Sequence, residues 1–204
     1  HNMALNFANN NSLSAISAKP SGLSGGALNL ISTQTASGSS TISFTSGIDD
    51  TYDSYVFKFI NIHPSADEAQ FLCNGSIDGG SNYNVVKTTN AFRAYHQEDN
   101  SSAGLSYVAG EDLAQSTAAF KLAYAVGNAA DESNSGEMWL FNPSSTNFVK
   151  HFMARNQFYH GYSSGYSIEH YAAGHFNNTN DVDAIQFSVN SGTFDGVIKL
   201  YGIS

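Results

Sequence analysis

The chain of 204 residues carries a formal net charge of −9, and only 12% of its residues are charged. So acidic a chain repels phosphate backbones, which excludes nucleic acid as an expected partner. A single cysteine, Cys73, excludes an internal disulfide and a zinc site of paired cysteines. No apolar run approaches the ~20 residues of a membrane-spanning helix, so we expect no membrane insertion.

The N-terminal stretch differs in composition from the rest. Residues 3–27 hold an Asn/Ser run and a Gly/Ser-rich segment, both typical of turns and linkers. Leu5, Phe7 and Leu13 interrupt this polarity. We therefore expect residues 3–27 to form an extended arm that packs on its own domain or on a neighbour, with a disordered end as the alternative. Residues 28–204 are expected to form a single β-sandwich domain.

From Leu28 onward, short runs of β-branched and aromatic residues alternate with turn signals. Residues 112–126 fit a helix or a strand, and the alternation of Phe120, Leu122 and Tyr124 favours a strand. The spacing predicts an all-β fold, an antiparallel β-sandwich of jelly-roll type. The other strands are expected at 28–35, 40–44, 55–62, 69–77, 83–89, 137–141, 150–159, 167–176, 184–189 and 197–203.

Three further expectations concern pairing. The turn residues 78–81 predict a hairpin between 69–77 and 83–89. Residues 97–117 are polar and rich in Ala and Ser, which indicates a long excursion outside the sheet. The apolar C-terminal segment is expected to pair with strands formed earlier in the chain.

Single side chains in these strands can also be assigned. On a regular strand, Tyr55, Phe57 and Phe59 share one face and Ile62 lies on the other. Both faces are mostly apolar, which predicts a central strand between two layers. Cys73 and Trp139 lie among apolar neighbours, so both are expected in the core.

Motifs for catalysis and metal binding do not survive inspection. Residues 161–165 match the pattern G-x-S-x-G, which requires a helix after the serine and a histidine after the acid. A strand is expected there instead, and no histidine follows Asp181 or Asp183. His170 and His175 are five residues apart, so a continuous strand points them to opposite faces. We expect no catalytic residue, no metal and no cofactor.

The segment 158–171 stands out because it combines five aromatic residues and two histidines with Ser and Gly. Rigid rings between small flexible residues are typical of adaptable binding loops, and ring faces beside polar donors suit saccharides. The alternative is a tyrosine-rich sheet edge or a subunit contact. The candidate ligand-binding residues are Tyr159, His160, Tyr162, Tyr166, His170 and Tyr171.

Several short segments, in order along the chain, together resemble a family of virion structural proteins found in marine phages, which are tail-fibre or capsid-decoration components. These segments are Leu28–Thr35, Phe44–Ile48 with Tyr52–Tyr55, Ser76–Ser81, Gly127–Ala130 with Ser135–Glu137, Leu140–Ser145, Ala184–Phe187 and Ile198–Ile203.

This resemblance implies a non-enzymatic structural component on the exterior of the virion, as a head decoration, fibre or tail-associated protein. Its expected partners are other virion proteins and further copies of the chain, with a trimer as the first expectation. A contribution to attachment to a host-surface glycan is also expected. The alternative function is a carbohydrate-binding β-sandwich module.

Overall fold

The computed structural model describes residues 27–162 and 165–203. Nearly all of the expected arm and Ser163 of the G-x-S-x-G match lie outside these residues. The described part of the chain contains strands and no helix. It therefore has no helix that is long and apolar enough to cross a membrane. The strands are β1 (Leu28–Ser39), β2 (Thr41–Phe44), β3 (Ser54–Pro64), β4 (Ala69–Ser76), β5 (Lys87–Gln97), β6 (Ala103–Tyr107), β7 (Leu113–Ser116), β8 (Phe120–Val126), β9 (Asn134–Phe141), β10 (Lys150–His160), β11 (Tyr166–Phe176), β12 (Ala184–Val189) and β13 (Phe194–Ile203).

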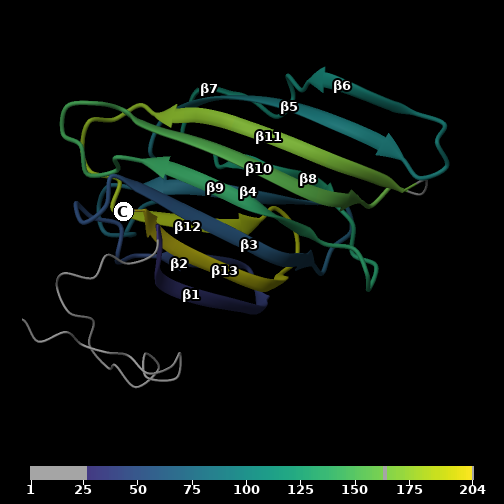
Figure 1. The fold of residues 1–204 in the computed structure, drawn as a ribbon, viewed down its shortest axis with the longest axis horizontal. Helices are drawn as coiled ribbons and strands as arrows, with labels where there is room; N and C mark the ends of the chain where they lie inside the picture. The colour runs from purple at the N-terminus through teal and green to yellow at the C-terminus, as the bar shows by residue number, and fades with distance from the viewer. Residues whose placement is uncertain (1–26, 163–164, 204) are drawn as a thin grey trace, which may run out of the picture.

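All thirteen strands belong to one antiparallel sheet, which confirms the all-β prediction. Its main path runs β1-β13-β3-β9-β10-β8-β4-β12-β2, and β11 pairs with β10 and carries β5 on its other side. Figure 1 shows β5, β11, β10, β9, β3 and β13 side by side in one curved layer. The end strands β1 and β2 contact each other, so the sheet is nearly closed, like a barrel. The jelly-roll arrangement stays a prediction.

Two of the pairing expectations are wrong and one is confirmed. The predicted hairpin does not form, because β4 pairs with β12 and β8 whereas β5 pairs with β11, β6 and β7. The supposed excursion at 97–117 contains β6 and β7, which both pair with β5. The C-terminal strand β13 pairs with β1 and β3, which confirms that it pairs with strands formed earlier in the chain. Residues 112–126 form β7 and β8, which confirms the strand interpretation.

The core lies inside the curved sheet and is rich in phenylalanine. Residues on the long strands alternate between this interior face and the outer face, as in β10, where every second residue from Lys150 to Phe158 is buried. Phe187 is fully buried and contacts four other rings with centroids 5.1 to 6.1 Å away, namely Phe44, Phe57, Phe59 and Phe71. Such aromatic contacts add to the burial of large apolar side chains.

The side-chain expectations have mixed outcomes. Cys73 is buried in the core, as predicted. A bulge between Phe59 and Ile62 returns Ile62 to the interior face, so its expected position opposite Phe59 is wrong. The prediction that Trp139 lies in the core is also wrong. Trp139 is half-buried beside Phe141, and its indole N–H donates to Glu137 at 3.0 Å.

Candidate functional site

A pocket of about 330 Å³ opens on the interior face where β5 and β10 end and β11 begins. Tyrosine rings, a histidine and an arginine guanidinium make up most of its wall. We call it the Arg93 pocket and define it by its lining residues, which are Arg93, Tyr95, Ser102, His160, Tyr162, Tyr166 and Ile168.

Strand register brings these distant residues together. Tyr95 on β5 lies opposite Ile168 on β11, and His160 on β10 lies opposite Tyr166. Because side chains alternate along a strand, Arg93 and Tyr95 point to the same face. The ring of Tyr95 meets that of Tyr166 edge-on, with centroids 6.0 Å apart. The pocket is therefore built mainly from the backbone pairing of three long strands.

His160 occupies the centre of the aromatic wall. Its ring contacts the rings of Tyr124, Tyr162 and Tyr166 at centroid distances of 5.7, 6.1 and 5.9 Å. Its Nδ1 accepts a hydrogen bond from the backbone N–H of Tyr162 at 3.0 Å, so the neutral ring carries its proton on Nε2. Burial lowers the pKa of His160. The side chain therefore serves as a neutral donor at neutral pH.

The close passage of two loops holds the end of β10 in place. The N–H of Gly161 donates to the carbonyl of Ala125, and the N–H of Gly127 donates to that of Tyr159, each at 3.0 Å. A Cβ at Gly161 would lie 3.0 Å from the Cα of Gly127, so the backbones approach closely because both positions are glycine. This contact fixes the direction in which His160 enters the pocket.

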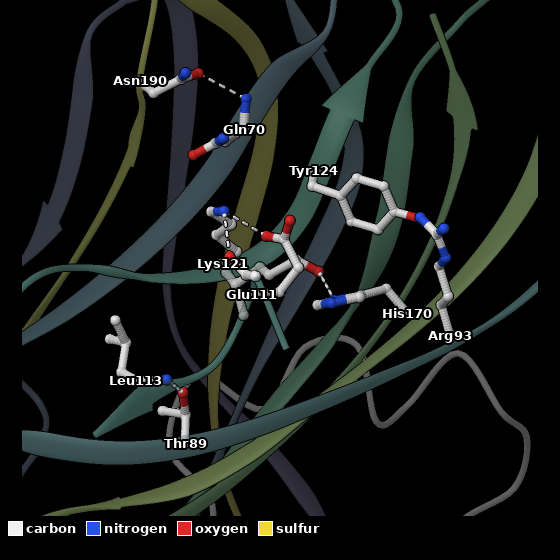
Figure 2. A network of polar contacts seen from close by, with 11 residues as sticks. Gln70, Thr89, Arg93, Glu111, Leu113, Lys121, Tyr124, His170 and Asn190 are labelled. Atoms are coloured by element: carbon white, nitrogen blue, oxygen red, sulfur yellow. Dashed lines mark hydrogen bonds and ion pairs between the residues drawn. The ribbon is translucent and has the colours of Figure 1, made fainter. Parts of the chain in front are cut away.

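Arg93 stands at the back of the pocket between two tyrosines. Its guanidinium carbon lies 5.5 Å from the centre of the Tyr95 ring and 5.0 Å from that of Tyr124. Nη1 donates a hydrogen bond to the hydroxyl of Tyr124, as Figure 2 shows. Nε is buried and has no hydrogen-bond partner within the described chain. Cation–π contacts with two rings hold the guanidinium, and its hydrogen bond to Tyr124 leaves most of its five N–H groups without a partner among the described residues.

The structure brings only half of the predicted ligand-binding residues together. His160, Tyr162 and Tyr166 line the pocket, whereas His170 is buried behind it with Nδ1 3.0 Å from the carbonyl oxygen of Leu122. His170 does not line the pocket and is fully buried in this structure, so its role as a ligand-binding residue stays a prediction.

Tyr159 and Tyr171 point to the outer face because strand side chains alternate. The Tyr159 hydroxyl donates to Glu98 at 3.0 Å. The ring of Tyr171 stacks on Phe92, with centroids 4.6 Å apart and planes 7° apart. Neither side chain lines the Arg93 pocket, so their role as ligand-binding residues stays a prediction.

A second hollow, of about 420 Å³, lies on the outer face over β9 and β10. It is lined by charges that neutralise one another. Lys58 pairs with Glu137, and Arg155 pairs with Glu169. Because each charge already has a partner, this hollow offers a ligand fewer free charged donors than the Arg93 pocket does.

Arg93, Tyr95, Ser102 and Ile168 were missed as site residues. The expected strand ended at residue 89, so Arg93 and Tyr95 received no assignment to a face. In the structure β5 continues to Gln97. The residues around Arg93 do not alternate clearly between polar and apolar, since Phe92 and Ala94 flank the charged Arg93, and the sequence did not show which strand would lie beside β5.

The described residues contain no group of three or more His, Cys, Asp or Glu side chains that could hold a metal ion. Comparisons with protein-family models, with curated proteins and with solved structures found no match to this chain. The geometry of the pocket is therefore what a functional proposal has to rest on.

Proposed function

We propose that the chain is a non-enzymatic structural component of the exterior of a phage particle, and that it contributes to host-surface attachment by binding a saccharide in the Arg93 pocket. The observation that carries the attachment role is the pocket itself, in which three tyrosine rings surround hydrogen-bond donors. The particle role is supported by the ordered set of segments that resembles virion proteins and by the low share of charged residues, 12%.

Saccharides suit this lining for two physical reasons. A sugar ring has an apolar C–H face that packs against aromatic side chains, and hydroxyl groups that need donors and acceptors. Tyr95, Tyr162 and Tyr166 supply ring faces and hydroxyl groups in one wall. Ser102 and His160 add further polar atoms. This set of groups favours binding over hydrolysis, because the lining within the described chain holds no carboxylate pair.

The finer architecture that we propose is a β-sandwich of jelly-roll type. Antiparallel pairing throughout and an interior filled by phenylalanine support it. We also propose that copies of the chain assemble, with a trimer as the first expectation, and that other virion proteins are its remaining partners.

Replacing both Tyr162 and Tyr166 by Ala tests the attachment role. The double variant removes two walls of the pocket, so we expect it to bind saccharides at least about tenfold more weakly than wild type on a glycan array. Tyr107→Ala is a matched control, because Tyr107 and Tyr162 are both 59% exposed but Tyr107 lies on β6 outside the pocket. Unchanged binding by the double variant, with the fold intact by circular dichroism, contradicts the proposal.

A carbohydrate-binding module that acts apart from any particle is the second candidate. The same pocket favours it, and it differs from the first candidate in needing no assembly. Native mass separates the two.

A further inference from the structure

The two arginines of the chain are in different electrostatic situations. On the outer face, Arg155 forms an ion pair with Glu169. Within the described residues, Arg93 forms no ion pair with a carboxylate, and its guanidinium contacts the rings of Tyr95 and Tyr124 and the hydroxyl of Tyr124. An arginine in a pocket without a counter-ion keeps its charge, because the guanidinium does not lose its proton in proteins.

The acidic side chains of the surroundings are engaged elsewhere. Glu111 pairs with Lys121 at 2.6 Å, and Glu98 accepts a hydrogen bond from Tyr159 at 3.0 Å. Asp67 accepts a hydrogen bond from the backbone of Glu68 at 3.0 Å. None of these carboxylates lines the pocket. Arg93 therefore has no ion-pair partner within the described chain at the place where a ligand would sit, while Glu68 and Asp67 act electrostatically on His160 in the same lining.

The net charge of −9 acts against anions approaching the molecule as a whole. That repulsion is screened over about 8 Å at physiological ionic strength, so exposed carboxylates farther away than this act weakly on an approaching ligand. Charge-assisted hydrogen bonds at contact distance are roughly twice as strong as neutral ones. The guanidinium of Arg93 therefore makes the pocket prefer anionic ligands, although the molecule as a whole is acidic.

We infer that the Arg93 pocket selects acidic saccharides, with a carboxylate of the sugar bound to the Arg93 guanidinium; this inference rests on the proposed saccharide-binding function. The planar guanidinium presents parallel N–H groups that match the two oxygens of a carboxylate. The Nε2–H of His160 and the hydroxyl of Ser102 are further donors in the same lining. The tyrosine rings cover the apolar face of the sugar.

The size of the pocket limits the ligand further. About 330 Å³ lies at the lower end of the ~300–1,000 Å³ range of small-molecule sites. That volume fits a terminal acidic sugar better than a long stretch of polymer. A terminal unit would enter from the rim at Tyr162, which is 59% exposed.

The test uses the full chain on an array of uronic acids, sialic acids and pyruvate-bearing sugars, each printed beside its methyl ester. Esterification removes the charge and keeps the ring, so we expect acids to bind at least about tenfold more tightly than their esters. Arg93→Gln should lower binding to the acids by about 10- to 100-fold. Arg155→Gln, the matched control at the only other arginine, should bind like wild type.

The outcomes distinguish failure of this inference from failure of the saccharide-binding proposal on which it rests. Equal binding of acids and esters by the wild type overturns the preference for acidic sugars and leaves saccharide binding standing. Binding of acids that survives Arg93→Gln overturns the role of Arg93. If no sugar on the array binds, both proposals fall. Arg93→Lys retains the charge without the planar fork, so it should lose less binding to the acids than Arg93→Gln does. Such an intermediate value shows that the loss follows the chemistry of residue 93 and is not caused by unfolding of the Gln variant.

Discussion

His170 is held in its neutral form by its surroundings. The side chain is fully buried, and Nδ1 lies 3.0 Å from the carbonyl oxygen of Leu122, which accepts its proton in a hydrogen bond. Burial lowers the pKa of His170 from 6.5 to about 4, and the nearby charges of Arg93 and Lys121 act in the same direction. Figure 2 shows His170 beside Arg93 and Tyr124.

This lowered pKa makes stability depend on pH. Between pH 6.5 and about 4 the unfolded chain binds a proton at His170 that the folded chain does not. The free energy of unfolding should therefore fall as the pH drops through this window, by roughly 1–3 kcal/mol. Urea unfolding at several pH values measures it. His170→Gln should flatten the curve in this window, whereas His96→Gln, at an exposed histidine, should not.

An unchanged pH dependence in His170→Gln would show that other groups cause the acid sensitivity. The pKa of Asp49 is also lowered, chiefly by hydrogen bonds from Thr51, so part of the loss below pH 4 belongs to carboxylates. Comparing His170→Gln with wild type measures how much of the loss of stability in acid is caused by His170.

Residue patterns predicted three of the seven residues that line the candidate site. His160, Tyr162 and Tyr166 belong to one dense aromatic segment, so composition alone pointed to them. Arg93 is far away in the sequence and reaches them only because β5 pairs with β11, where Arg93 lies opposite His170. Alternation along a strand gives the face of a side chain but not the strand beside it, and that second fact decides which residues meet.

At the scale of elements, β9 and β10 approach very closely at Gly136. A Cβ at this position would lie 2.3 Å from the backbone oxygen of Arg155, an atom that cannot move without shifting the strand. Gly136→Ala should therefore destabilise the fold by about 1–3 kcal/mol in denaturant unfolding.

Gly110→Ala is the control for this variant, because a Cβ at Gly110 would meet no atom within 4 Å. It should change the free energy of unfolding by less than about 0.5 kcal/mol. Equal stability of the two variants would mean that β9 and β10 are not as close at Gly136 as described.

The segment 78–82 shows why local signals did not predict pairing. Its turn chemistry was correctly recognised, since the Asp78 carboxylate accepts hydrogen bonds from the backbone of Asn82 at 2.8 Å and from Ser76 at 2.7 Å. Turn residues fix the local path of the chain but not the partner of the strand that follows. After this turn the chain enters β5, which pairs with β11 rather than with β4.

At the scale of the whole molecule, the all-β fold class was predicted from the sequence, because the alternation of apolar and polar residues is repeated over many strands. Sequence reasoning did not predict the nearly closed path, which depends on contacts between strands far apart in the chain, such as β1 with β13 and β4 with β12. Low-charge β domains of this kind suit assembly, and β6 offers a sheet edge with Leu105 73% exposed and Tyr107 59% exposed.

The claim that the chain is a subunit of a larger particle is tested most directly by its native mass, measured by light scattering. We expect a mass near three times 21.8 kDa for the full chain. A variant without residues 3–27 should fall to the monomer mass while circular dichroism still reports a β fold. A full-length chain that is monomeric at every concentration would contradict the particle role and leave the solitary carbohydrate-binding module as the better description.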